Sequence, residues 1–325
     1  MKLEARLVKL SARSGEFNNA LDSYLIEQAK TQQLAYAPSP ETRAAVFLTH
    51  WMPTISVGNT QKISLDVDKD ACNRQGVSIV RRHSGGQAVY LDQNYLVISM
   101  LFPNTESNIF SDQNLGSLRE RLSRTIARAL NEVGVRAEFY PPDNVVVRAQ
   151  SPRAQLKPIA NAGQVVSMSY DGKLKGVFLQ TSIRYSPQNP RAITNLLKIN
   201  GNSLRGYERQ ISELLASVSE FSNATRQEVE EKLLSHLAQE YSLVWREHLL
   251  TGEEEQEIWE LAEKEKARLR DREHYKSRGI CYLTLDGKCL LDGASEWLEA
   301  KPSTLADSTL CARPSQPKEE IKLAG

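Results

Sequence analysis

The sequence contains no apolar run long enough to form a transmembrane helix. None of its segments reaches about 18 consecutive apolar residues, and residues 1–6 carry no hydrophobic signal region. We therefore expect a cytoplasmic protein. Its 325 residues, of which 40% are apolar, are enough to bury a core in one large domain or two ordinary ones.

An excess of charge of either sign is also absent. The 41 lysines and arginines nearly balance the 40 aspartates and glutamates, which leaves a formal net charge of +1. Proteins that grip nucleic acid or anionic membranes without sequence specificity need a strong positive field. We therefore predict no nucleic-acid partner and no membrane partner.

Cysteine is scarce, with four residues at positions 72, 281, 289 and 311. This number is too small for a disulfide scaffold, and no CxxC pair suggests a zinc site. Cys281 and Cys289 flank an Asp286-Gly287 turn, but the register of such a hairpin places Cys289 opposite Thr284. We predict four reduced thiols, none of them between residues 73 and 280.

The segment 81–92 is the part of the chain that suggests chemistry. It begins with the pair Arg81-Arg82 and contains the pair Gly85-Gly86 between two β-rich runs. Glycine allows a backbone to approach a ligand closely, and guanidinium groups suit carboxylate and phosphate oxygens. The segment therefore predicts an anionic ligand held on a glycine turn between strands.

This segment resembles the RRxSGGGAVxHD signature of the lipoate-protein ligase A family, in the superfamily of biotin ligases and octanoyltransferases. Residues 19–22 are similar to the family's N-terminal helix and residues 53–61 to its viGRxQN strand. Residues 143–147 resemble its NDxxV motif and residues 157–162 its KxSGxA motif. The matches keep the family's order and extend over about residues 15 to 185.

The resemblance implies an α+β fold in which a mixed β-sheet is flanked by helices, as in class II synthetase and biotin ligase catalytic domains. We expect the catalytic domain at residues 1–245 and a smaller accessory domain at residues 246–300. The tail at residues 301–325 is rich in proline, serine and charge, and we predict that it is disordered.

The periodicity of the sequence predicts the main elements. Strands are expected near residues 44–50, 54–57, 76–80, 95–101 and 145–147, and a hairpin about Asp171-Gly172. Helices are expected from Asn18 or Asn19, from Ser111 or Asp112 to Gly134, and after the capping boxes that begin at Thr225 and Thr251. Residues 148–161 are expected to form an irregular, mobile loop.

A carboxylate is a poor acylating group in water, so a ligase first converts the acid to an acyl adenylate. The resemblance implies ATP, Mg²⁺ and lipoate or octanoate as the reactants, and a lipoyl-carrier protein, either a lipoyl domain or a glycine cleavage H-like protein, as the acyl acceptor. Lys157 is the expected catalytic cation, because charge grows on phosphoryl oxygens during this reaction.

The other expected site residues line the substrate, the nucleotide or the metal. Arg82 is expected to meet the phosphate or the acyl carbonyl, Arg81 to act as its structural partner, and His83 to line the turn. Asn144 is the expected metal contact. The predicted substrate-binding and ATP-binding residues are Gly58, Asn59, Arg82, Ser84, Gly85, Gly86, Gln87, Ala88, Asp143, Asn144, Ala162, Gly163 and Gly176.

Several positions depart from the family pattern. Gln87 replaces the third glycine, as in the related octanoyltransferases, and Leu91 replaces the usual histidine. The order Asp143-Asn144 is the reverse of the motif, which leaves open which of the two side chains faces the site. Residues 157–162 also lack the central glycine of their motif.

Two alternatives to an ATP-dependent ligase remain. One is an ATP-independent octanoyl or lipoyl transferase, but such enzymes use a cysteine nucleophile, and residues 73–280 contain none. The other is a protein that binds an acyl ligand or a lipoyl domain and has lost catalysis, for which Gln87 and Leu91 are the best support. A biotin ligase is disfavoured because its GRGRxGR loop is missing.

Overall fold

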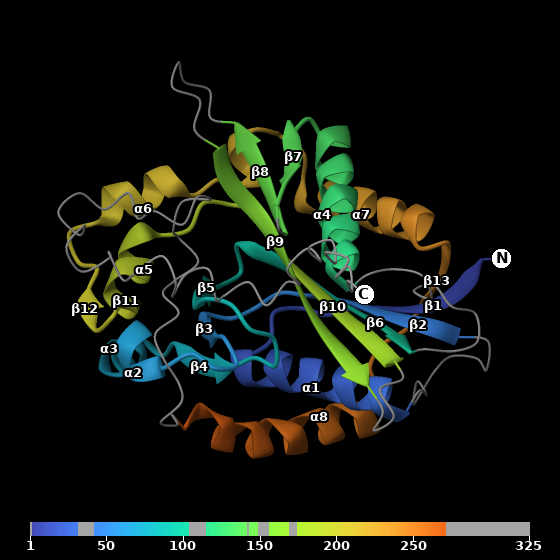
Figure 1. Cartoon of the computed structure of the whole chain (residues 1–325), viewed down its shortest axis with the longest axis horizontal. Coiled ribbons are helices and arrows are strands. Elements are labelled where there is room, and N and C mark those ends of the chain that lie inside the picture. Colours follow the sequence, from blue (N-terminus) through green and yellow to red (C-terminus); the bar gives the residue numbers. More distant parts are fainter. Residues whose placement is uncertain are drawn as a thin grey trace, which may run out of the picture.

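The computed structural model describes residues 2–31, 42–103, 115–141, 143–148, 156–168 and 174–270. In this part of the chain an eight-stranded mixed sheet has the order β13-β1-β2-β6-β10-β9-β8-β7, a three-stranded sheet the order β4-β3-β5, and β11 pairs with β12 (Figure 1). The prediction of an α+β fold with a mixed sheet between helices is confirmed.

The large sheet is built from β1 (Leu3–Lys9), β2 (Thr42–Thr49), β6 (Tyr95–Pro103), β7 (Ala137–Tyr140), β8 (Asn144–Arg148), β9 (Leu156–Met168), β10 (Leu174–Arg184) and β13 (Leu243–Glu247). The smaller sheets are built from β3 (Thr54–Val57), β4 (Ser78–Arg81) and β5 (Val89–Leu91), and from β11 (Lys198–Ile199) and β12 (Asn202–Ser203).

The helices are α1 (Gly15–Thr31), α2 (Ile63–Asp66), α3 (Lys69–Gln75), α4 (Leu115–Glu132), α5 (Pro190–Leu196), α6 (Glu208–Leu214), α7 (Arg226–Glu240) and α8 (Gly252–Glu265), with short 3-10 turns η1 (Val218–Glu220) and η2 (Lys266–Leu269). No helix in the described ranges is long and apolar enough to cross a membrane.

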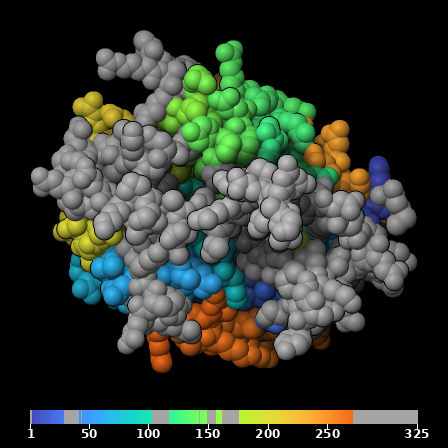
Figure 2. Space-filling model, in the orientation of Figure 1, coloured from blue at the N-terminus to red at the C-terminus, as the bar shows by residue number. Residues whose placement is uncertain are grey.

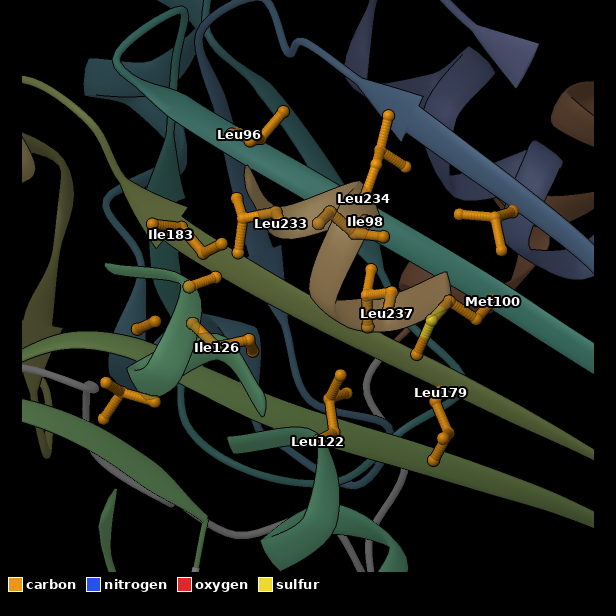
Figure 3. Packing of buried hydrophobic residues seen from close by; sticks show 14 of the residues in the cluster. Leu96, Ile98, Met100, Leu122, Ile126, Leu179, Ile183, Leu233, Leu234 and Leu237 are labelled. Carbon is orange, nitrogen blue, oxygen red and sulfur yellow. The ribbon is translucent and has the colours of Figure 1, made fainter. Parts of the chain in front are cut away.

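One face of the large sheet packs against α4 and α7. Alternate residues of a strand point to the same face, so one set of positions on β6 and β10 meets the apolar stripes of both helices. Figure 3 shows this core, which includes Leu96, Ile98, Met100, Leu122, Ile126, Leu179, Ile183, Leu233, Leu234 and Leu237. All of these side chains are buried.

The opposite face of the large sheet is covered by α1, and α8 lies over α1 as a second layer (Figure 1). Phe47, Leu101 and Phe178 of the sheet join this second core, to which α8 contributes Ile258 and Ala262. Helix α1 also packs against β4 of the small sheet. It therefore connects the two sheets.

The chain beyond the expected domain boundary packs on the same body. Trp245 lies in β13, which pairs in parallel with β1 at the edge of the large sheet. In α8, Glu254 forms a buried bidentate pair with Arg6, with N–O distances of 2.5 and 2.7 Å. Residues 271–325 lie outside the described residues, so the accessory domain at 246–300 and the disordered tail remain predictions.

The described elements confirm most of the predicted pattern. The strand at 54–57, the antiparallel β9–β10 pair and both capping boxes are present, with Thr225 and Thr251 as N-caps. The start of the first helix is wrong, because α1 begins at Gly15 and the hydroxyl of Ser14 accepts from the N–H of Phe17. The turn at 171–172 lies outside the described residues.

The expectation of an irregular loop around Lys157 is also wrong. Lys157 lies in β9 and pairs with Val147 of β8. Proline breaks a ladder unless it sits at an edge or a bulge, and the register of the two strands shifts between Val145 and Val146. Pro158 lies at this irregularity, where its missing N–H does not interrupt the strand.

Candidate functional site

The predicted glycine turn joins β4 to β5 and contacts the loop that follows β3. The N–H of Asn59 donates to the carbonyl oxygen of Ser84 at 3.0 Å. A Cβ atom on Gly58 would lie 2.1 Å from the carbonyl oxygen of Gly86, and Gly86 itself has a φ of +94°. Both positions therefore require glycine. Gly85 is exposed, and a Cβ atom added there would meet no other atom within 4 Å.

Arg82 holds this turn from within. Its Nη1 donates to the carbonyl oxygen of Ser56 at 2.9 Å, and its Nη2 donates to those of Gly85 and Gln87, both at 2.8 Å. Ser84 and Gln87 are half-buried and Ala88 is buried. The guanidinium braces the turn, and its contact with a phosphate or acyl carbonyl remains a prediction.

Arg81 has the structural role expected for it. Its side chain is buried, and Nη1 donates to the carbonyl oxygens of Gly58, Asn59 and Gln61 at 3.1, 3.2 and 2.7 Å. Its Nε donates to the carbonyl oxygen of Arg268 at 2.6 Å. A buried guanidinium is tolerated only when its donors are satisfied. Arg81 therefore fixes the loop at 58–61 against the strand that carries the turn.

A buried carboxyl group lies on α1, facing the large sheet. Asp22 accepts hydrogen bonds from Ser99 Oγ at 2.9 Å and from Gln180 Nε2 at 2.6 Å. Burial raises the pKa of Asp22 to about 7, while the two hydrogen bonds act in the opposite direction and lower it. Sequence reasoning found only a resemblance at 19–22, although the polar residues Asn19, Asp22 and Ser23 on a buried helix face were a visible signal.

The two residues of the reversed pair Asp143-Asn144 have different surroundings, because β8 begins at Asn144 and Asp143 lies just before it. Asp143 accepts from Arg119 Nη1 of α4 at 2.9 Å, and burial raises its pKa while Arg119 acts to lower it. Asn144 is the neighbour of Val145, which lies in the core under α4, so alternation places Asn144 on the other face, toward α1. Asn144 is therefore the member of the pair that faces the side of α1.

The register of β9 places the remaining motif residues. Lys157 is half-buried and pairs with Val147, whose side chain lies in the core under α4, so Lys157 lies on the α4 face of the sheet and not on the face toward α1. Among the described residues its ammonium has no hydrogen-bond or ion-pair partner. The backbone at 163 pairs with Gln180, which binds Asp22, and the backbone at 162 pairs with Thr181. Gly176 is buried and pairs with Pro103 and Ser167, further along β10 from this group.

The arginine-rich face of α4 is occupied by ion pairs. Arg121 and Arg128 both bind Glu240 of α7, and Arg124 binds Glu120 within the helix. With Arg119 bound to Asp143, these four arginines of α4 all have carboxylate partners. The face is therefore used within the molecule.

The described ranges contain neither a metal-binding cluster nor a reactive thiol. These ranges contain no group of three or more His, Cys, Asp or Glu side chains able to hold a metal ion. Cys72 of α3 is buried among apolar residues, and burial raises the pKa of its thiol to about 12. The other three cysteines lie outside the described residues. A thiol with such a pKa is not a nucleophile at neutral pH.

Comparison with known proteins agrees with the geometry. Residues 14–238 match the family model described as the lipoyl protein ligase A/B catalytic domain. The chain belongs to this family.

Proteins named for two different activities are similar to this chain. An octanoyltransferase LipM of Geobacillus kaustophilus is 24% identical over 258 residues, which cover 76% of this chain and 89% of that protein. A probable lipoate-protein ligase A of Mycoplasma pneumoniae is 25% identical over 134 residues, which cover 41% of this chain and 35% of that protein.

Solved lipoate ligases share the fold of this family member. The bipartite lipoate protein ligase of Thermoplasma acidophilum, studied with its E2 lipoyl domain, aligns with a TM-score of 0.64 at 19% identity and covers 83% of this chain and 99% of its own. A lipoate-protein ligase A bound with ATP aligns with a TM-score of 0.60 at 19% identity, with coverages of 81% and 95%.

Proposed function

We propose that this protein is an ATP-dependent lipoate-protein ligase that transfers lipoate or octanoate to a lysine of a lipoyl-carrier protein. The observation that carries this choice within the family is the position of the thiols. Residues 73–280 contain no cysteine, and Cys72 is buried with a thiol pKa of about 12. Transfer without ATP requires a thiolate to accept the acyl group.

The reaction then runs in two displacements. A carboxylate oxygen of the acid attacks the α-phosphorus of ATP and releases diphosphate, and the acceptor lysine amine attacks the acyl carbonyl and releases AMP. Negative charge accumulates on the phosphoryl oxygens in the first step, where a positioned cation has its largest effect. Lys157 on β9 is the residue predicted from the sequence to supply this cation, although its pairing with Val147 places it on the α4 face of the sheet. The exposed glycines at 85 and 86 are the proposed backbone contact with the acid.

Magnesium has weak support in the described residues. Mg²⁺ is usually held by one or two carboxylates together with substrate phosphates. The carboxylate of Asp143 is bound to Arg119, and Asn144 offers a carboxamide oxygen only. The described residues therefore do not fit a protein-held magnesium ion.

The second candidate is an ATP-independent octanoyltransferase. It is favoured by the relatives, because several proteins that match over most of their own length are octanoyltransferases LipM, among them one of Clostridioides difficile. The ligase is favoured by solved neighbours, one of which holds lipoic acid and another ATP. A lipoyl domain or a glycine cleavage H-like protein is the proposed acceptor in either case.

Lipoate-dependent release of diphosphate from ATP tests the proposal. We expect release with wild-type protein and lipoate or octanoate. Lys157→Ala identifies the source of the cation: a loss of about 10²- to 10³-fold assigns it to Lys157, because one donor to a developing charge is removed, and a wild-type rate excludes Lys157. Arg148→Ala is the matched control, since Arg148 is an exposed residue of the neighbouring strand that binds only Glu138 among the described residues. Folded wild-type protein that forms no acyl adenylate with either acid would exclude the ligase.

A further inference from the structure

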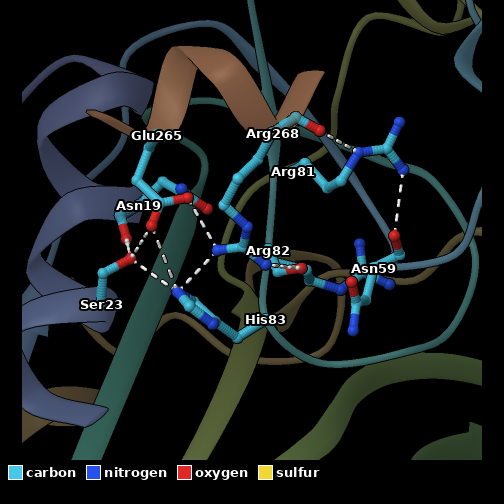
Figure 4. A network of polar contacts seen from close by, with 8 residues as sticks. All are labelled: Asn19, Ser23, Asn59, Arg81, Arg82, His83, Glu265 and Arg268. Atoms are coloured by element: carbon cyan, nitrogen blue, oxygen red, sulfur yellow. Dashed lines mark hydrogen bonds and ion pairs between the residues drawn. The ribbon is translucent and has the colours of Figure 1, made fainter. Parts of the chain in front are cut away.

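The C-terminal end of α8 covers the segment that leads into the glycine turn. Arg268 of η2 meets three consecutive residues of this segment (Figure 4). Its carbonyl oxygen accepts from Arg81 Nε at 2.6 Å, its Nη1 lies 2.6 Å from His83 Nε2, and its Nη2 lies 3.5 Å from the carbonyl oxygen of Arg82. Residues near the end of the described chain therefore complete the packing around 81–83.

His83 joins this contact to α1. Its Nε2 lies 2.7 Å from Ser23 Oγ and 3.5 Å from a carboxylate oxygen of Glu265. Arginine can only donate, so His83 Nε2 accepts from Arg268 and the imidazole proton resides on Nδ1. The His83 ring thus contacts both α1 and η2 and joins them to the arginine segment.

Glu265 completes the network from the α8 side. It binds Arg268 Nη1 at 2.7 Å and accepts from Ser23 Oγ at 3.0 Å. Burial raises the pKa of this carboxyl, but its polar contacts, among them the ion pair with Arg268 and the hydrogen bond from Ser23, outweigh burial and hold the pKa below its ordinary range. The network is therefore stabilised with Glu265 ionised and Arg268 charged.

Helix α8, which leads into η2 and Arg268, is firmly attached to the rest of the molecule. Helix α8 is attached by the buried pair between Glu254 and Arg6 and by the burial of Ile258 and Ala262. Figure 2 shows the orange surface of α8 and η2 along the lower edge of the molecule, beneath the blue surface of the N-terminal third. A helix anchored in this way can hold in place the more exposed turn that it contacts.

The segment 81–83 controls both halves of the candidate site. Arg81 donates to carbonyl oxygens in the loop at 58–61, and Arg82 donates to carbonyl oxygens in the turn at 84–87. We propose that His83 and Arg268 are positioning residues, through which the docking of α8 and η2 holds these two loops in the geometry that receives the acyl ligand. The proposal rests on the proposed function only in naming an acyl acid as the ligand.

The test compares full-length variants by two independent measurements. His83→Leu removes the acceptor and Arg268→Ala removes the donor, while His83→Gln keeps an acceptor near the Nε2 position. Lys266→Ala is the matched control, because Lys266 also lies on η2 but forms an exposed pair with Glu263. Hydrogen exchange over residues 56–61 and 81–88 reports the loops, and the KM and kcat for the acid report the site.

We expect His83→Leu and Arg268→Ala to exchange faster in both loops and to raise the KM for octanoate about tenfold, with a smaller change in kcat. His83→Gln should recover most of both losses, and Lys266→Ala should match wild type. If His83→Leu is too unstable to purify, the same comparison is made between Arg268→Ala and Arg268→Lys, of which the lysine variant should keep partial function.

Unchanged exchange and unchanged KM in Arg268→Ala would overturn the proposal, and so would a His83→Gln variant as impaired as His83→Leu. Failure of the proposed function has a different signature. In that case wild-type protein forms no acyl adenylate, while the exchange of both loops still rises in Arg268→Ala and recovers in His83→Gln.

Discussion

The two faces of the large sheet bury different kinds of side chain. The face under α4 and α7 is an apolar core in which leucine, isoleucine, valine and methionine interlock. The face under α1 contains the buried polar group of Asp22, Ser99 and Gln180 beside its apolar residues. Burying a carboxyl group costs free energy. The face under α4 and α7 therefore contributes to the stability of the fold, whereas the face under α1 is less favourable for stability and is the face on which we propose ligand binding.

The largest effect that separates the two faces is expected from matched leucine variants. Leu122→Ala on α4 and Leu21→Ala on α1 remove side chains that are both fully buried. Each should lower the free energy of unfolding by about 2–5 kcal/mol, measured by urea denaturation. Only Leu21→Ala should also raise the KM for the acyl acid, because α1, unlike α4, packs against β4, the strand that leads into the glycine segment. Equal effects on KM would mean that the faces do not differ in function.

A smaller effect is expected from the titration of Asp22. Its pKa is raised from 3.8 to about 7 by burial, so the folded protein keeps a proton that the unfolded chain loses. The contribution of Asp22 to the free energy of unfolding therefore falls as pH rises from about 4 to about 7, and it does not change further above pH 7. Relative to that of wild type, the free energy of unfolding of Asp22→Asn should rise by up to about 4 kcal/mol across this window.

Urea unfolding of both proteins between pH 4 and pH 8 checks this prediction. Asp70→Asn is the control, because Asp70 is exposed on α3. A difference between Asp22→Asn and wild type that does not vary with pH would show that the Asp22 carboxyl titrates normally, and that the α1 face carries no such cost.

Local patterns predicted the parts of the fold that local physics determines. The strand at 54–57 and the helices after Thr225 and Thr251 follow from alternation, periodicity and capping boxes. The position of Lys157 did not follow, because its neighbour Pro158 favours a loop until pairing with β8 and a shifted register make room for it. Pairing between strands is a long-range property that a local pattern does not contain.

The candidate site divides in the same way. The glycine turn was recognisable because Gly58 and Gly86 allow a close approach that no other residue permits. The partners of Arg81 and Arg82 were not recognisable from the sequence, because Arg82 binds backbone carbonyl oxygens and Arg81 reaches Arg268, 187 residues away. Asp22 was missed as a titrating group because its burial depends on strands contributed by distant segments.

The most direct test of the proposed ligase uses a variant that lacks all four thiols, with alanine at Cys72 and serine at Cys281, Cys289 and Cys311. The measurement is the mass of a lipoyl domain after incubation with this variant and lipoate, with and without ATP. We predict acylation near the wild-type rate that depends on ATP. A variant that no longer acylates the domain although it is folded, or wild-type protein that transfers octanoate from a carrier without ATP, would contradict the account.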